Sequence, residues 1–412
     1  MKHYRIVWGF LMEALDILDR LNEIEVYYEP IFSADSQSIV AFQVSGKLEI
    51  NGNTIDIVNF TYDSSVPEEL RKETEVQLIK MALKEAKNKL NEYYLYLPCN
   101  PNLFMTDVGE LYFQTIKQTI DESLLPKIYL VIPAHKYQGD AEELHHPIRY
   151  MKTYGVKIAL DDIGKDSNLD QIFMLEPTVL MINIAQLNYD AWGSQSHVFT
   201  TIQNLAIKMG ATLMFKDIKT DYQLHHAWKH GARYFKGEYL QKPSAQLNPT
   251  DALKERFSND CKQFIATERK QLELKYEEMK KLKRTIATIV EQSRIQSNDE
   301  ESLLALANKL TPYAFRFYIC DEEGFQISPN IVRKNGEWEV EKEALGKNWS
   351  WRPYFLMNII KLKEDTKGEL SNIYSDIKTG ELTRTFSMAL DDNEYLFVDI
   401  SYDYLYEHNL LY

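Results

Sequence analysis

The alternation of short β-rich runs with longer helical stretches constrains this chain more than any other feature. Between Val26 and Leu240, runs rich in Val, Ile, Tyr and Phe are separated by segments whose apolar residues have helical spacing. The strand candidates are residues 26–32, 39–48, 93–98, 128–134, 157–163, 179–184, 212–218 and 234–240. Eight strands interleaved with helices predict an α/β fold, a (β/α)8 barrel of the TIM type. The turn 33–38 between the first two strands is too short for a parallel crossover and predicts one antiparallel pair.

The barrel is expected to be one of four parts of the chain. Residues 1–25 are assigned to an N-terminal helical extension, 26–248 to the barrel, 249–296 to a long connecting helix and 297–412 to a smaller domain. The boundaries follow the end of the strand–helix alternation near Pro243 and the change to a continuous helical pattern after it.

The predicted connecting helix has an unusually uniform sequence. Neither glycine nor proline occurs between Asp251 and Arg294, and apolar residues recur there at helical spacing. Glu268 and Lys275 interrupt the apolar stripe, which argues against a long coiled coil. The pattern favours a signalling helix that packs partly on its own barrel and partly on a partner, over a merely solvated linker.

The C-terminal part predicts an α+β unit. A β-rich run begins at Phe315, a helix is expected around residues 356–363, and two β-rich runs follow. The turn at Lys378-Thr379-Gly380 between alternating residues is a hairpin signal. Strand, helix and antiparallel strands in this order resemble the plan of PAS-like and Cache-like sensor domains.

Composition narrows the class of protein. The formal charge of −14 over 412 residues argues against nucleic acid or an anionic membrane as a partner. Three cysteines far apart in sequence fit a reducing compartment and give no zinc signal. The apolar stretch 6–12 is too short for a membrane span, so the chain is expected in the cytoplasm, with Met12 as a second candidate start.

Three segments resemble the EAL-domain phosphodiesterases. They are YYEPIFSADSQSIVAFQVSGKL from Tyr27, ALDDIGKDSNLDQIFMLEPTVLMIN from Ala159, and GATLMFKDIKTDYQLHHAWKHGARYFKGEYLQKP from Gly210. Residues 349–355 and 374–386 resemble the accessory domain of a two-domain EAL protein. The resemblance implies hydrolysis of cyclic di-GMP with divalent metals that polarise the phosphodiester and generate hydroxide.

Most positions that carry the family's chemistry are altered in this chain. Gln43 matches the Glu of the name-giving motif, Lys47 the Arg that grips the phosphate, and Met181 the catalytic Lys. The paired acids survive as Asp161 and Asp162. The remaining matches are Pro98 for a metal-binding Asn, with Asn100 as a substitute, Val131 for a Glu, Asn183 for an Asp, Lys216 and Lys219 for two Glu, and Lys236 for a Gln.

These replacements remove carboxylates from the expected metal site. Asp161 and Asp162 alone do not satisfy the six or more oxygen ligands of Ca²⁺. With Lys216 and Lys236 nearby, we expect the family's divalent metal to be lost, with no metal site intact and no cofactor. One of the two acids is expected to pair with Lys216 and the other to face the opposite side of its strand, rather than to form a residual metal site. The barrel is therefore predicted to be degenerate and not an enzyme.

The lysines that replace residues of the EAL pattern allow two interpretations. Lys47, Lys216 and Lys236, together with Asp161, are candidates for a metal-free site that binds cyclic di-GMP or another phosphate. The alternative is drift in an unused cavity. His226 and His230 have a metal-compatible helical spacing, but an ordinary helix surface is the favoured reading.

A second candidate pocket is expected in the C-terminal domain. Trp351, Arg352 and Tyr354 are candidates to bind a small carboxylate, as Cache-like domains do, and Asp399 to hold an amine. The competing reading is a packed core and dimer surface, because clustered aromatic residues more often bury area.

The predicted function is that of a catalytically inactive signalling protein, acting as a cyclic di-GMP-related effector, scaffold or partner-binding module. The resemblance implies a homodimer formed partly through the barrel face, and an unidentified protein partner is expected. One alternative is an active phosphodiesterase with a rewired site. The other is a small-metabolite sensor that binds through the C-terminal domain.

Overall fold

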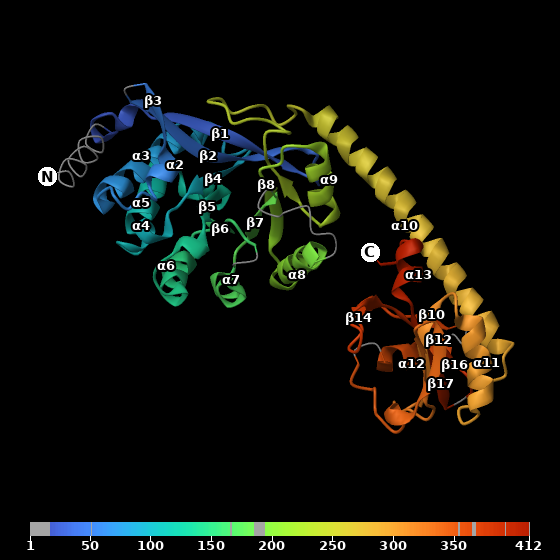
Figure 1. Ribbon diagram of the computed structural model, residues 1–412. Helices are drawn as coiled ribbons and strands as arrows, with labels where there is room; N and C mark the ends of the chain where they lie inside the picture. The colour runs from blue at the N-terminus through green and yellow to red at the C-terminus, as the bar shows by residue number, and fades with distance from the viewer. Residues whose placement is uncertain are drawn as a thin grey trace. The chain divides into compact units, whose positions relative to one another are not determined.

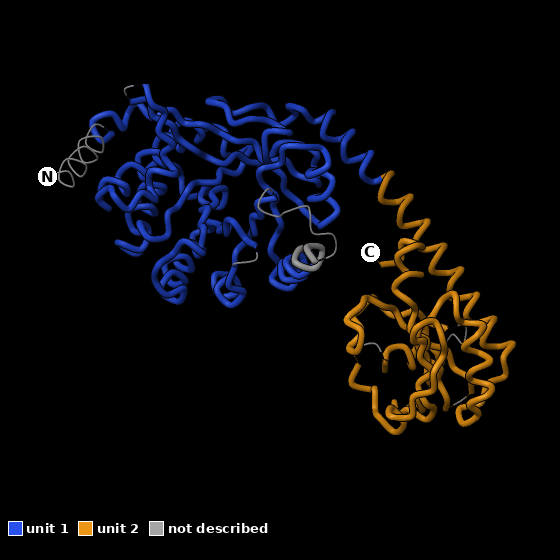
Figure 2. The backbone as a smooth tube through the Cα atoms, in the orientation of Figure 1, with its two compact units in different colours: residues 1–265 blue, residues 266–412 orange. Residues whose placement is uncertain are grey.

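The structure, shown in Figure 1, is a computed structural model that describes residues 17–50, 52–164, 167–184, 194–352, 355–364, 368–391 and 393–411. The chain divides into two compact units, residues 1–265 and 266–412, coloured separately in Figure 2. The described part of the expected N-terminal extension includes the 3-10 helix Leu21–Glu23. Ile17 and Leu21 are buried in the core of the first unit.

A closed barrel forms the first unit and confirms the predicted fold class. Its strands are β1 (Glu25–Ser33), β2 (Ser38–Ile50), β4 (Tyr94–Pro98), β5 (Ile128–Ile132), β6 (Lys157–Leu160), β7 (Val179–Asn183), β8 (Thr212–Lys216) and β9 (Tyr234–Phe235). The order β1-β9-β8-β7-β6-β5-β4-β2 is closed by the pairing of β1 with β2. The strand β3 (Asn53–Asp56), which the sequence did not predict, extends β2 as an antiparallel hairpin.

The strand β1 runs against the rest of the barrel. Its short connection to β2 forces antiparallel pairing, from Glu25 opposite Lys47 to Ser33 opposite Ser38. It is also antiparallel to β9, whereas the pairs from β2–β4 to β8–β9 are parallel. The predicted antiparallel pair is confirmed, and the second follows from the same inversion. This register places Glu29 opposite Gln43.

Helices pack around the outside of the parallel strands (Figure 1). They are α3 (Glu68–Ala86), α5 (Glu110–Thr119), α6 (Ala141–Thr153), α7 (Leu169–Leu175), α8 (Ser194–Met209) and α9 (Asp221–Lys229), with the short α2 (Ile57–Phe60) and α4 (Pro101–Met105) after β3 and β4. Side chains of Asp140, Asn168 and Thr220 accept hydrogen bonds from the first turns of α6, α7 and α9, which fixes where these helices begin. Strands covered on both faces are apolar throughout, as in Ile128–Ile132, where every residue is buried.

The helix α10 (Lys254–Glu291) belongs to both units. At ~1.5 Å per residue its 38 residues span about 57 Å. Near its start, Phe257, Cys261 and Phe264 are part of the barrel core. Near its end, side chains of residues 282–290 are part of the core of the second unit. The middle of the helix exposes Leu272 and its neighbours Leu274 and Tyr276, so the expected linker has apolar side chains at both ends and an uncovered centre.

The second unit contains an antiparallel sheet with helices on both faces. Its elements are α11 (Glu300–Leu310), β10 (Ala314–Asp321), β11 (Asn330–Lys334), β12 (Glu337–Glu341), α12 (Phe355–Glu364), β13 (Glu369–Leu370), β16 (Thr385–Ala389), β17 (Glu394–Ile400) and α13 (Tyr402–Glu407), with the sheet order β12-β11-β10-β17-β16-β13. Phe317 and Ile319 face a core shared with α10 and α11, while Tyr318 packs on the other face with Phe355 of α12. The predicted hairpin is present as β14 (Tyr374–Ser375) paired with β15 (Leu382–Thr383).

Two further sequence expectations concern spans and cysteines. Within the described ranges no helix combines the length and the apolar composition that a membrane crossing needs. Cys99, Cys261 and Cys320 are all buried and none is in a disulfide. Burial raises the pKa of the Cys99 thiol well above its usual value, so this side chain is an inert part of the core.

Candidate functional site

The carboxyl ends of the barrel strands surround a cavity of about 360 Å³. Its polar lining consists of Glu29, Gln43, Ser45, Asp56, Asn59, Tyr62, Lys136, Asp161 and Asp217. Barrels of this type place their binding and catalytic groups at this end, because the loops that follow the strands meet there. The cavity is therefore the candidate site of the first unit.

Lys216, the last residue of β8, is held by both acids of the pair that follows β6. Its Nζ lies 2.7 Å from Asp161 Oδ1 and 2.7 Å from Asp162 Oδ1. Burial on its own lowers the pKa of Lys216, but the two carboxylates outweigh it and raise this pKa above its usual value. The predicted pairing with one acid is thus present. The expectation that the other acid faces away is wrong, because a left-handed backbone at Asp162 (φ 53°) turns its carboxylate toward the same ammonium.

Lys236 is the second buried ammonium of the barrel. Its Nζ lies 2.5 Å from Glu29 Oε2. This ion pair links β1, which carries Glu29, to Lys236, the residue after β9. The next residue, Gly237, has φ 148°, and a Cβ there would lie 2.3 Å from the backbone nitrogen and oxygen of Ile218. Only glycine therefore permits the close approach of this turn to Ile218, and the turn positions Lys236.

Lys47 lies apart from the two buried lysines. It is exposed on β2, with its Nζ 4.9 Å from the centre of the Tyr27 ring. Ser45 lines the cavity, and Lys47, two residues further along the strand, projects from the same face. The three lysines predicted to form a phosphate clamp are consequently not equivalent. Lys216 and Lys236 have carboxylate partners, whereas Lys47 contacts an aromatic ring.

Three acids of this site were missed from the sequence. Glu29 belongs to β1, Asp56 ends the unpredicted β3, and Asp217 directly follows β8. Asp217 has a left-handed backbone, with φ 62°, a conformation that is uncommon for residues other than glycine. Counting the register back from the turn 33–38 would place Glu29 opposite Phe42. A β-bulge between Ile31 and Phe32 shifts the register by one residue and brings Glu29 opposite Gln43, so this pairing could not be read from the sequence.

The donor set of this cavity fits a hard cation. Gln43 Oε1 is buried and has no hydrogen-bond partner among the described residues. An amide oxygen and carboxylates are ligands that Ca²⁺ takes, and Gln43, Asp161 and Asp217 line the same cavity. Within the described ranges no three His, Cys, Asp or Glu side chains are grouped to hold a metal. An ion here would therefore need the amide oxygen and water in addition to carboxylates.

Other positions of the EAL pattern have become structural. Val131 lines the cavity, and Met181 is fully buried in the barrel interior, where neither supplies a ligand or a base. Asn100, considered as a substitute ligand, is used elsewhere. Its Oδ1 accepts from the backbone of Asn102 and its Nδ2 donates to the Thr61 carbonyl, so it caps α4.

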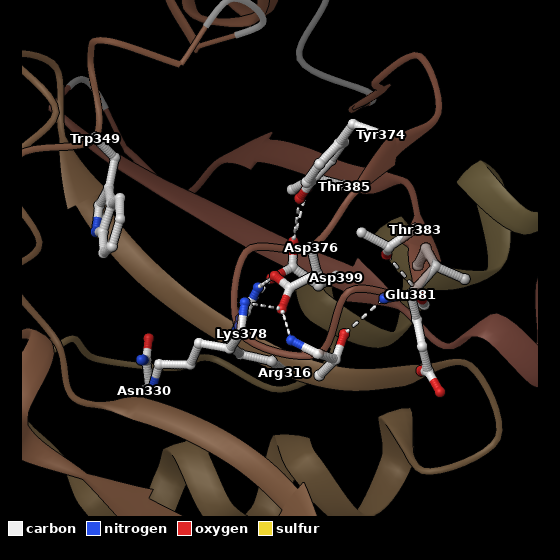
Figure 3. A network of polar contacts seen from close by, with 12 residues as sticks. Arg316, Asn330, Trp349, Tyr374, Asp376, Lys378, Glu381, Thr383, Thr385 and Asp399 are labelled. Carbon is white, nitrogen blue, oxygen red and sulfur yellow. Dashed lines mark hydrogen bonds and ion pairs between the residues drawn. The ribbon is translucent and has the colours of Figure 1, made fainter. Parts of the chain in front are cut away.

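The acid expected to bind an amine in the C-terminal domain already has a partner. Asp399 is fully buried, and its Oδ2 accepts from Arg316 Nε at 2.6 Å while its Oδ1 accepts from Thr385 (Figure 3). Arg316 also pairs with Asp376 in the same network. The prediction that Asp399 is available to a ligand is therefore wrong, because a guanidinium from β10 occupies the position of the expected amine.

The other residues of that predicted pocket are spread over the surface and the interior. Arg352 is mostly buried, with its guanidinium carbon 4.9 Å from the centre of the Trp349 ring, and it lines cavities on two sides. Trp351 is exposed at the edge of one of them. Tyr354 lies outside the described residues.

The two histidines with metal-compatible spacing lie in the barrel, His226 on α9 and His230 directly after it. Their rings are stacked with centres 4.3 Å apart, which agrees with a structural role.

Comparison with known proteins places this geometry in a family. The EAL domain matches residues 11–243, and the EAL-domain associated signalling protein domain matches residues 247–412. The chain belongs to the EAL-domain family of signalling proteins. It is 39% identical to the uncharacterized EAL-domain containing protein YkuI of Bacillus subtilis (strain 168), over 97% of this chain and 99% of YkuI.

Solved structures agree with this assignment. The crystal structure of B. subtilis YkuI, in complex with substrate c-di-GMP and calcium, matches with a TM-score of 0.91 over 97% of this chain and 100% of that one. The Xanthomonas citri FimX EAL domain, 15% identical, matches with a TM-score of 0.50 over 60% of this chain and 98% of its own, and shows the fold alone.

The calcium in the YkuI complex overturns one expectation. We expected no cofactor, on the ground that the divalent metal had been lost with its ligands. A relative 39% identical to this chain is in complex with calcium, so a divalent metal is bound in this family. The sequence argument failed because it counted only replaced acids. It left out Glu29, Asp56 and Asp217 and the free oxygen of Gln43, all of which line the cavity.

Proposed function

We propose that the barrel is a receptor for cyclic di-GMP, which it binds together with a divalent cation and does not hydrolyse. The family assignment and the YkuI complex support the ligand. The observation that carries the proposal is the position of Lys216, whose ammonium occupies both Asp161 and Asp162 at the end of β8.

The charges around the cavity favour a cation as part of the complex. Five carboxylates are present, from Glu29, Asp56, Asp161, Asp162 and Asp217, against three ammonium groups, from Lys136, Lys216 and Lys236. A phosphodiester brought into this acidic site is repelled unless a positive ion lies between the two. Gln43, Asp217 and the Oδ2 of Asp161, whose Oδ1 contacts Lys216, would hold such an ion.

The same residues argue against hydrolysis. A divalent ion in such a site supplies positive charge to the phosphate and lowers the pKa of bound water. Lys216 neutralises the acids that would otherwise draw in a second ion. Val131 and Met181 are apolar where the EAL pattern has a metal ligand and the catalytic lysine, so no general base replaces them.

Lys47 completes the proposed ligand contacts. It is the exposed ammonium on the face of β2 that also carries Gln43 and Ser45, and it matches the phosphate-binding Arg of the EAL pattern. A homodimer and a protein partner remain part of the proposal. In the middle of α10, Leu272, Leu274 and Tyr276 are exposed and offer an apolar surface for such a contact.

Calorimetric titration of the full chain with cyclic di-GMP tests the binding claim. We expect binding in CaCl₂ that weakens at least tenfold in EGTA. Asp217→Asn keeps a residue that tolerates the left-handed backbone and should weaken the calcium-dependent binding. Asp170→Asn, an exposed first-turn residue of α7, is the matched control and should leave it unchanged.

Chromatography of cyclic di-GMP incubated with Mg²⁺ or Mn²⁺ tests the absence of hydrolysis. Undegraded nucleotide after prolonged incubation is expected. Formation of the linear dinucleotide, abolished by Asp161→Asn, would establish the rewired phosphodiesterase instead. If cyclic di-GMP binds neither in calcium nor in EGTA, the proposed receptor function is wrong and a role as a protein scaffold is the alternative.

A further inference from the structure

Arg384, a buried guanidinium of the second unit, borders a cavity of about 710 Å³. The cavity lies between α12, the segment 369–377 and the residue before β16. Its volume is within the range of small-molecule sites. Neither Arg316 nor Asp399 lines it, but Tyr374, which donates a hydrogen bond to Asp399, does.

Arg384 lines this cavity, and no carboxylate of the described part of the chain pairs with it. It is 8% exposed, its Nε donates to the Leu410 carbonyl at 3.0 Å, and its Nη1 donates to the Ser371 carbonyl at 3.0 Å. Within the described residues no carboxylate forms an ion pair with it and its Nη2 has no hydrogen bond. Burial alone accounts for the lowering of the Arg384 pKa from its usual value.

The neighbouring charges do not neutralise this guanidinium. Glu369 is the one acid among the described residues that line the cavity, and it is already shared by Lys283 at 2.7 Å and Lys361 at 3.3 Å. Among the described residues that line the cavity, Arg384 is therefore a buried cation that Glu369 does not pair with.

The rest of the wall has an apolar part and a polar part. The apolar residues are Met279, Trp351, Met357, Leu370, Ile373 and Ile377, and the uncharged polar residues are Asn358, Ser371, Asn372, Tyr374 and Ser375. An inorganic anion would satisfy the charge but would leave the apolar part in contact with water. A ligand with both a carboxylate and an apolar body satisfies the two parts of the wall together.

We propose that this cavity binds a small amphipathic carboxylate, which pairs with Arg384 and lays its apolar body against the wall around Met357. A structural role for Arg384 as a link between two carbonyls explains its hydrogen bonds. It does not explain a buried positive charge, because a neutral donor would join the same carbonyls without the cost of desolvating an ion. The site is independent of cyclic di-GMP and of the barrel.

Calorimetry of the full chain with octanoate and with octanamide separates the carboxylate from the apolar body. Octanoate is expected to bind at least tenfold more tightly than octanamide. Equal affinities, or no binding of octanoate at millimolar concentration, would overturn the proposal.

A pair of adjacent substitutions on α12 locates the site. Met357 lines the cavity and is 56% exposed, whereas Leu356 is 57% exposed and does not line it. Met357→Glu supplies an acid within the cavity and should weaken octanoate binding at least tenfold. Leu356→Glu introduces the same charge one residue away and should change the affinity less than twofold. An equal effect of the two variants would contradict the assignment, and circular dichroism of both confirms that α12 has folded.

Discussion

Lys216 of the barrel and Arg384 of the second unit are both buried cations beside a cavity, but among the described residues only Lys216 has a carboxylate partner. Lys216 contacts two carboxylates at 2.7 Å, and these raise its pKa. Arg384 contacts two carbonyl oxygens, and burial lowers its pKa. Carboxylate partners compensate a buried charge within the fold, whereas a charge held only by dipoles stays uncompensated, which is the charge that the proposed carboxylate ligand would neutralise.

This comparison changes how the basic residues of the barrel are interpreted. From the sequence, lysines in place of acids suggested a basic cavity. In the structure, Lys216 and Lys236 are neutralised by Asp161, Asp162 and Glu29, and the cavity remains acidic. An acidic cavity fits a divalent cation beside the nucleotide, and the YkuI complex contains calcium.

The largest expected effect is that of Lys216→Met. Removing the ammonium leaves Asp161 and Asp162 together without a cation, which should lower the free energy of unfolding by about 3–5 kcal/mol in denaturant titration. Added Ca²⁺ should restore much of the loss, because an ion bound only to the folded state stabilises it. Lys136→Met, which removes an exposed lysine of the same cavity, should change stability by less than about 0.5 kcal/mol. Equal losses of unfolding free energy for the two variants would show that the ion pair of Lys216 contributes no more to stability than an exposed lysine does.

A buried acid without a cation extends the comparison to negative charge. Glu75 is fully buried, accepts from the Asn100 backbone and from Tyr112, and burial raises its pKa from 4.5 to about 7. Between these values the folded chain keeps a proton that the unfolded chain loses, so stability falls as the pH rises from about 4.5 to about 7 and then levels off.

At about 1.4 kcal/mol per pH unit the total change is about 3 kcal/mol. Glu75→Gln should remove this slope in urea titrations across that pH range. The exposed neighbour variant Glu73→Gln should keep it. A slope that persists in Glu75→Gln would assign the dependence to another group.

Arg384→Met should cost less than Lys216→Met. The two lost hydrogen bonds are offset by removal of a desolvated charge, and a net loss of about 1–2 kcal/mol is expected in denaturant titration. If Arg384→Met lowers the free energy of unfolding as much as Lys216→Met does, the two cations do not differ in what they contribute to stability. Arg384 would then be a structural link between the two carbonyl groups.

The smallest expected effect is a gain in stability from Met357→Glu. The new acid on α12 provides the counter-charge that Arg384 lacks and should raise the free energy of unfolding by roughly 0.5 kcal/mol at low salt. Leu356→Glu should give no such gain. Loss of the difference between them at high salt would identify the gain as electrostatic.

The barrel was predictable because its signal is local. Each strand is a short apolar run next to a helical pattern, and the turn 33–38 fixes the inversion of β1. The carboxyl ends of the strands follow directly. The structure brings Gln43 and Asp161 to one cavity and Lys216 beside Asp161, while their role in binding stays a prediction.

The pairings within the site were not predictable because they join residues that are distant in sequence. Lys236 and Glu29 are 207 residues apart, and Arg316 and Asp399 are 83 apart. Asp56 lies on a strand without a sequence signal of its own. The sequence around Arg384 likewise gives no sign that, among the described residues, its guanidinium contacts carbonyl oxygens and no carboxylate.

The central claim is that the barrel binds cyclic di-GMP with a divalent cation and leaves it intact. One calorimetric titration of the full chain, in CaCl₂ and again in EGTA, followed by chromatography of the recovered nucleotide, tests it most directly. The account predicts binding that depends on calcium and nucleotide recovered unchanged. Binding unaffected by EGTA, or recovery of the linear dinucleotide, would contradict it.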